Sequence, residues 1–140
     1  MIQISTLMLA LLWPEFRGPT GQGISEERGL PLTWSETRNV RWKVAIPGRG
    51  WSSPAILGDR IWLTTATDEG RSLRAISLDR NSGAIDRNIE VFRLKDQSKI
   101  NSKNSHASPT PLVEGDRIYV HFGAHGTACI TQTGEIVWKT

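Results

Sequence analysis

The sequence is poor in the features that mark several common classes of protein. It contains one cysteine, Cys129, in 140 residues, so no disulfide can form within the chain and the cysteine count does not identify the compartment. Aromatic residues make up 7%, and the basic residues are scattered although the net charge is +3. No apolar run approaches the roughly 20 residues that span a bilayer. We therefore expect neither a nucleic-acid partner nor a transmembrane span.

Motifs for catalysis or metal binding are also scarce. The run Gly48-Arg49-Gly50 lacks the Gly-Lys-Ser/Thr ending of a phosphate-binding loop, and no helical pattern follows it. His121 and His125 have the spacing of a helical metal pair, but the glycines around them predict a strand followed by a turn. Cys129 lies in an apolar stretch and is expected to be buried in a strand. The sequence thus predicts no catalytic residue and no metal ligand.

The residues that are abundant favour short strands joined by tight turns. The chain has 13 glycines, 7 prolines and 6 tryptophans, and from residue 40 apolar and polar residues alternate in short runs. Gly58-Asp59 is a two-residue signal for a hairpin of the primed type. The strands expected from this pattern cover 40–44, 61–63, 73–78 and 89–92, and residues 97–105 are expected to form a polar surface loop.

The N-terminal part of the chain has a different character. Residues 1–12 are mostly apolar and match the length of a signal-peptide core, although no basic residue precedes them and no small-residue cleavage site follows. Prolines and glycines interrupt residues 13–39 too often for a helix, which predicts an irregular segment. The organisation expected is a truncated signal peptide over 1–12, an irregular segment over 13–39 and a repeat region over 40–140. We expect export to the periplasm or cell envelope.

The repeat region contains the same landmarks twice, in the same order. Gly58-Asp59-Arg60-Ile61-Trp62-Leu63 matches Gly115-Asp116-Arg117-Ile118-Tyr119-Val120 with an offset of 57 residues. Ser53-Pro54 matches Ser108-Pro109 at an offset of 55, and Ser82-Gly83 matches Thr133-Gly134 at an offset of 51. A unit of about 50 residues with three or four short strands cannot bury both faces of its sheet alone. The pattern therefore predicts sheets that stack side by side.

Tryptophans mark the ends of the expected units. Trp42 and Trp138 stand at strand ends, where a large ring can pack between neighbouring sheets. The corresponding place in the first full unit, four residues after Gly83, holds Arg87 instead. We therefore expect that unit to lack its tryptophan.

These residues resemble a known repeat family. Trp-Lys at 42–43 and 138–139, Gly-Asp-Arg-Ile-Trp/Tyr, and Leu-Asp-x-x-Ser-Gly at 78–83 are similar to the pyrroloquinoline-quinone-like repeat, and residues 13–19 resemble the start of exported members. The resemblance implies an all-β fold, a partial β-propeller of about two antiparallel four-stranded blades behind an irregular N-terminal segment. Family members close six to eight blades, so we expect this chain to be a fragment of a longer protein.

The resemblance does not imply an enzyme in this segment. Quinone-dependent dehydrogenases of the superfamily hold pyrroloquinoline quinone with calcium, an aspartate base and adjacent cysteines, whereas this sequence has no Cys-Cys pair. Its acids at 59, 79, 114 and 116 fall at expected turns. We therefore expect no quinone cofactor here. The alternatives that stay open are part of such a dehydrogenase, or the sensor propeller of a kinase-related signalling protein.

A candidate binding rim is formed by four residues. Trp51 lies three residues before Pro54 and His106 three before Pro109, so the sequence comparison places them at the same end of neighbouring units, with Arg49 and Asn104 beside them. Aromatic and hydrogen-bonding groups on loops at one end suit a protein or small-molecule ligand, although packing of the loops is the alternative. We expect a non-catalytic scaffold that binds or assembles other components in the cell envelope.

Overall fold

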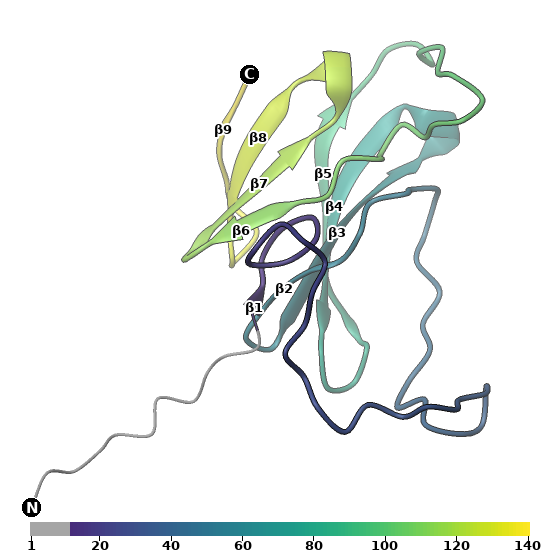
Figure 1. Ribbon diagram of the computed structural model, residues 1–140. Helices are drawn as coiled ribbons and strands as arrows, with labels where there is room; N and C mark the ends of the chain where they lie inside the picture. The colour runs from purple at the N-terminus through teal and green to yellow at the C-terminus, as the bar shows by residue number, and fades with distance from the viewer. Residues whose placement is uncertain (1–11) are drawn as a thin grey trace, which may run out of the picture.

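The computed structural model describes residues 12–140 and consists of two antiparallel β-sheets (Figure 1). The first sheet has five strands in chain order: β1 (Leu12–Trp13), β2 (Ala55–Leu57), β3 (Arg60–Thr67), β4 (Ser72–Asp79) and β5 (Ile85–Arg93). The second has four, again in chain order: β6 (Leu112–Glu114), β7 (Arg117–His121), β8 (Thr127–Thr131) and β9 (Ile136–Lys139). The expected all-β fold is confirmed.

Helical structure in residues 12–140 is limited to two short 3-10 turns. They are η1 (Asp68–Gly70), between β3 and β4, and η2 (Gly123–His125), between β7 and β8. Within this part of the chain, no helix has both the length and the apolar character needed to cross a membrane. The prediction of a strand followed by a turn around the two histidines is confirmed, because His121 ends β7 and His125 ends η2.

The first hairpin of each sheet has the same register. In the β2–β3 hairpin Ile56 pairs with Ile61, and in the β6–β7 hairpin Val113 pairs with Ile118. Each hairpin turns through Gly-Asp, with the glycine at φ +58° for Gly58 and +56° for Gly115. A glycine with positive φ at the first turn position and a following residue with negative φ fit a primed two-residue turn, which follows the right-handed twist of the strands. The hairpin prediction is confirmed.

The two sheets also share an irregularity further along. Ile61 pairs with Leu78 across β3 and β4, and Ile118 pairs with Ile130 across β7 and β8. The pairing with the last strand of each sheet is interrupted just before these residues. The β4–β5 pairing shifts between Ser77 and Leu78, and the β8–β9 pairing shifts between Cys129 and Ile130. A bulge bends its strand and increases the local twist, so the last strands of both sheets leave their ladders in the same way.

The first sheet differs from the expected four strands because the N-terminal segment contributes one. Trp13 of β1 pairs with Ile56, and the carbonyl oxygen of Pro14 accepts a hydrogen bond of 2.8 Å from the backbone N–H of Val113. Residues 12–14 therefore join the edges of both sheets. The signal peptide expected over residues 1–12 lies outside the described residues except for Leu12, which begins β1.

The strand expected over residues 40–44 does not form. These residues have no partner in a ladder, although the alternation that suggested a strand is present, because Trp42 and Val44 are half-buried while Arg41 and Lys43 are exposed. An extended backbone becomes a strand only when another strand lies beside it. The other strand predictions, 61–63, 73–78 and 89–92, are confirmed within β3, β4 and β5.

The core lies between the two sheets. Its largest fully buried side chain is Trp62 of β3, whose Nε1 donates a hydrogen bond of 3.3 Å to Oε1 of Gln132 in the second sheet's last turn. The rings of Phe92 and Phe122 meet edge to face at 5.9 Å. The buried apolar residues that form this core come from both sheets: Ala55, Leu73, Ala75, Val91, Val113, Ile118, Val120, Ala128 and Ile130. Cys129 is buried in β8, as predicted.

The two marker tryptophans occupy different environments. Trp42 packs against the turn that joins β4 to β5, with its Nε1 donating to the carbonyl oxygen of Arg80 at 2.9 Å. Trp138 lies on the last strand of the second sheet, β9. It is 45% exposed and its ring lies 6.2 Å from that of Tyr119 in its own sheet. All four residues of β9 are exposed.

Candidate binding cavity

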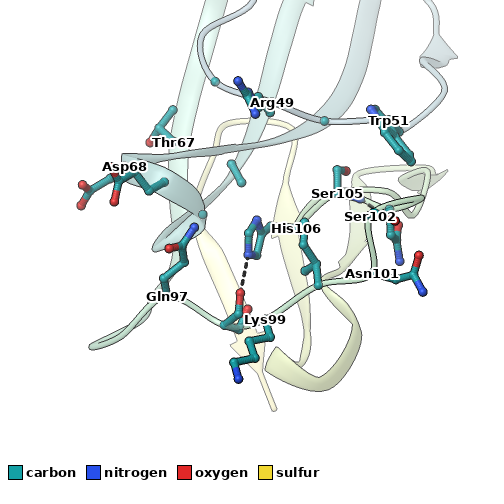
Figure 2. A pocket seen from close by; sticks show the side chains of 18 residues that line it. Arg49, Trp51, Thr67, Asp68, Gln97, Lys99, Asn101, Ser102, Ser105 and His106 are labelled. Carbon is teal, nitrogen blue, oxygen red and sulfur yellow. Dashed lines mark hydrogen bonds between the residues drawn. The ribbon is translucent and has the colours of Figure 1, made fainter.

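A cavity of about 1600 Å³ opens where the end of β3 meets the long loop after β5. All four residues of the expected binding rim, Arg49, Trp51, Asn104 and His106, line it. Figure 2 shows Arg49 and Trp51 on one segment, the loop from Gln97 to Ser105 facing them, and His106 between the two. The structure therefore brings the four residues together around one hollow.

The first wall is the segment 48–51, which lies close against β3. A Cβ atom on Gly48 would be 2.3 Å from the carbonyl oxygen of Ala66, and one on Gly50 would be 2.4 Å from that of Thr64. Only glycine permits this approach. Arg49 between them exchanges two backbone hydrogen bonds of 2.9 Å with Ala66. The two glycines thus permit the backbone pairing of this segment with β3.

Trp51 stands at the end of this wall with its backbone fixed and its ring free. Its N–H donates a hydrogen bond of 2.9 Å to the carbonyl oxygen of Ala107, so its backbone is tied to the opposite segment. The side chain is nevertheless 58% exposed. A large flat ring left open beside a cavity offers apolar contact area at small cost in conformational entropy.

The base of the cavity is the strained turn η1. Asp68, Glu69 and Gly70 all have positive φ, at 52°, 55° and 92°, and two of the three carry a Cβ atom that disfavours this region. Ion pairs hold the turn, because the Asp68 carboxylate lies 2.6 Å from Nη2 of Arg71 and 2.7 Å from Nη2 of Arg93. The hydrogen bond from Arg71, followed by the charges of Arg71 and Arg93, lowers the pKa of Asp68 below its ordinary value.

His106 packs directly on the glycine of this turn. A Cβ atom on Gly70 would lie 2.4 Å from Cε1 and Nδ1 of the imidazole, so no other residue fits there. The Nε2 atom lies 2.9 Å from the carbonyl oxygen of Ser98, drawn as the dashed line in Figure 2. A carbonyl only accepts, so Nε2 carries the proton and donates. His106 therefore fastens the loop to the turn.

The second wall is the loop 97–105, which carries neutral hydrogen-bonding side chains. The Oδ1 atom of Asn101 accepts from the N–H of Lys103 at 2.9 Å, and that of Asn104 accepts from the N–H of Ser105 at 2.9 Å. Both amide oxygens are thus engaged within the loop, which leaves each Nδ2 group as a donor without an intramolecular partner among the described residues. The loop expected over 97–105 is confirmed, and it forms a wall rather than a mere connection.

The charges on the lining are balanced. Arg49 and Lys99 are positive, and Asp68 and Glu69 are negative. The carboxylate of Asp68 is paired with Arg71 and Arg93, which lie outside the lining. By formal charge the lining residues themselves carry two groups of each sign, so they form no cluster of one sign.

The histidines near the cavity do not converge on a common point. His125 Nε2 lies 2.9 Å from Oγ of Ser98, while His121 Nδ1 lies 2.9 Å from Oγ1 of Thr127 in its own sheet. Within residues 12–140, no three His, Cys, Asp or Glu side chains gather as a metal site requires.

Sequence reasoning found residues on both walls of the cavity but did not predict the backbone strain of the turn at its base. Nothing in Asp68-Glu69 indicates a left-handed backbone. The hairpin register also changes one landmark: the offset of 57 residues between Gly58 and Gly115 places Pro54 on Pro111 rather than on Pro109. Trp51 and His106 are therefore not at equivalent positions of the hairpin register. They reach the same cavity through the hydrogen bond of Trp51 to Ala107 and the packing of His106 on Gly70.

No model of a known protein family matches the sequence, and no curated protein matches it either. The two sheets and the cavity at their end are therefore the observations that bear on function.

Proposed function

We propose that the two sheets are neighbouring blades of a β-propeller of the pyrroloquinoline-quinone-like repeat type, and that the chain works as a non-catalytic binding scaffold. The observation that carries the proposal is the shared construction of the sheets. Their first hairpins have the same register and the same Gly-Asp turn, and their last ladders have a bulge at the corresponding place. Two sheets built to one plan are typical of radial repetition.

The packing of the sheets supports the same proposal. β2 and β6, the first strand of each hairpin, lie in contact. At the opposite edge Nζ of Lys139 donates a hydrogen bond of 3.1 Å to the carbonyl oxygen of Val91, so β9 meets β5. Corresponding strands therefore face one another, as the blades of a propeller do. The exposed strand β9, with the large apolar residues Val137 and Trp138, is of the kind that a further blade covers.

The binding role follows from the cavity. In repeat proteins loops at one end of the stack carry function while the strands hold them in place. Here the ends of β3 and β5 hold Trp51 and the polar loop on opposite sides of a wide hollow. The partner in our proposal is a protein or small molecule of the cell envelope, the compartment that the resemblance to exported propellers implies.

The experiment compares retention of envelope components by the wild-type chain and by the Trp51→Ala, Arg49→Ala double variant. Both chains are immobilised at equal density, and the bound material is identified by mass spectrometry. We expect components held by the wild-type chain to be lost from the double variant, because both side chains lie on the exposed wall and neither is part of the core.

The control is Trp34→Ala, which removes a tryptophan that is 70% exposed and does not line the cavity. Retention by this variant should equal that of the wild-type chain, and all three proteins should melt at the same temperature. Equal retention by the double variant and the wild-type chain would overturn the binding role of the cavity.

A further inference from the structure

The geometry points to a neutral oligosaccharide as the ligand of the cavity, bound with one sugar ring on the indole of Trp51 and its hydroxyl groups on the amides of the facing loop. This inference rests on the proposed function, because it names the ligand class for the same cavity. Four properties of the lining carry it: an open aromatic ring, a row of neutral hydrogen-bonding groups, balanced charge and large size.

The aromatic ring supplies the apolar contact. Trp51 is 58% exposed while its backbone N–H is bonded to Ala107, so the residue is anchored beside the cavity and its indole is open to a ligand. The C–H groups on one face of a pyranose ring are weakly apolar and pack on the negative face of an aromatic system. A tryptophan side chain has only two χ angles, so it loses little conformational entropy when a ligand orders it.

The facing wall supplies the hydrogen bonds. Seven of the lining residues are neutral hydrogen-bonding residues: Thr67, Gln97, Ser98, Asn101, Ser102, Asn104 and Ser105. A side-chain amide N–H donates to a hydroxyl oxygen, which accepts while its own O–H donates elsewhere. The Nδ2 groups of Asn101 and Asn104 are available because the amide oxygens are engaged within the loop. Neutral donors of this kind suit hydroxyl groups better than phosphates or carboxylates.

The charge of the lining argues against an anionic ligand. Arg49 and Lys99 share the lining with Asp68 and Glu69, whereas sites for phosphates or acidic chains gather cations or backbone N–H groups. The lining is equally unlike a peptide groove. Its large apolar side chains are Trp51 and Ile100 alone, and Arg49 beside Trp51 already uses its backbone N–H and C=O on Ala66.

The size of the cavity favours a chain over a single sugar. A volume of about 1600 Å³ exceeds the roughly 300–1,000 Å³ that encloses one small ligand. The hollow is open along the loop from Gln97 to Asn104, so several sugar units can lie in it while one stacks on the ring. We therefore expect the cavity to recognise an oligosaccharide chain rather than a single sugar unit.

The test is calorimetric titration of the full chain with maltohexaose, mannohexaose and N-acetylchitohexaose, and with hexagalacturonate as the charged probe. We expect at least one neutral hexasaccharide to bind and Trp51→Ala to weaken its binding about tenfold, which corresponds to loss of one aromatic contact. Trp51→Phe should recover most of the affinity because it restores a ring. Trp34→Ala is the matched control and should bind as the wild-type chain does.

The outcomes separate the ligand class from the binding role. Preference for hexagalacturonate, or binding of a neutral sugar that Trp51→Ala leaves unchanged, would overturn the inference. If no saccharide binds but a mixed decapeptide library is retained in a Trp51-dependent way, the saccharide is wrong while the binding scaffold stands. If no probe binds and retention of envelope components is also insensitive to the cavity variants, both proposals fall.

Discussion

The indole of Trp42 covers the backbone of Gly83. A Cβ atom on Gly83 would lie 2.5 Å from Cε3 of the ring, and the ring's Nε1 donates to the carbonyl oxygen of Arg80 in the same turn. The glycine has φ +75° and is buried. A residue from the segment before the first hairpin thus closes the last turn of the first sheet, 41 positions further along the chain.

Gly83→Ala should destabilise the protein more than a comparable change elsewhere. Alanine at positive φ costs about 1–2 kcal/mol, and displacement of the Trp42 ring adds about 1–3 kcal/mol. The control is Gly58→Ala, since Gly58 has φ +58° but no atom within 4 Å of its Cβ position. Denaturant unfolding measures the difference. Equal losses of unfolding free energy in the two variants would show that the ring does not constrain the turn.

Arg87 packs on the last turn of the second sheet, as Trp42 packs on the last turn of the first. Its Cδ atom lies 3.3 Å from the Cβ position of Gly134, and its Nε donates to the carbonyl oxygen of Thr133 at 3.1 Å. Arg87→Trp should therefore keep the contact and unfold at a higher denaturant concentration than Arg87→Lys, which loses the Nε–H donor at a cost of about 0.5–1.5 kcal/mol. Should Arg87→Trp be no more stable than Arg87→Ala, the two positions are not alike.

The turn after β4 also makes stability depend on pH. Hydrogen bonds from the hydroxyl and N–H of Ser82, and from the N–H of Asn81, lower the pKa of Asp79 below its ordinary value of 3.8. Because the folded pKa is the lower one, the stabilisation is complete above pH 3.8 and is lost as the pH falls through the folded value. Asp79→Asn should therefore unfold more easily than the wild-type chain at pH 7, with the gap closing in acid.

A nuclear magnetic resonance titration of the carboxyl groups checks the cause. Ser82→Ala should raise the pKa of Asp79 towards 3.8, because it removes the first of these hydrogen bonds. The pKa of Asp68, which is lowered by Arg71, should not move and serves as the internal control. An unchanged pKa for Asp79 in the variant would assign the shift to the backbone donors alone.

Gly70→Ala should loosen the cavity while leaving the sheets folded. The new methyl group would occupy the place of the His106 ring, so the hydrogen bond from Nε2 to Ser98 must break. We expect faster amide hydrogen exchange over residues 97–106 and weaker ligand binding, with unchanged exchange in β4 and β8. Gly115→Ala is the control, because Gly115 shares the positive φ but has open space around it. Protection of the loop in Gly70→Ala would contradict a fastening role for His106.

Local patterns in the sequence were sufficient to predict single hairpins. Alternation and a Gly-Asp pair are enough for β3 and its turn, since a strand and a two-residue loop are decided by neighbours along the chain. β1 could not be found in this way. Leu12 and Trp13 form a strand because Leu57 and Ile56 lie beside them, and the segment 40–44, with the better pattern, has no such neighbour.

The cavity shows the same limit. Trp51 and His106 stood out as ring-bearing residues in loops, and the structure places them on one hollow. Its base depends on a left-handed turn at Asp68 and on the salt bridge to Arg93, 25 positions away. Nothing in the local sequence specifies that contact. The base of the cavity could not be predicted because the residues that hold it are far apart in the sequence.

The link made by residues 12–14 has a mechanical consequence. Trp13 is paired with β2 and Pro14 with Val113 of β6, so tension applied along β1 pulls parallel to the first ladder and is passed to the edge of the second. Rupture in this direction requires hydrogen bonds to fail together rather than one after another. A load that enters through this short strand is therefore shared by both sheets before either one is peeled open.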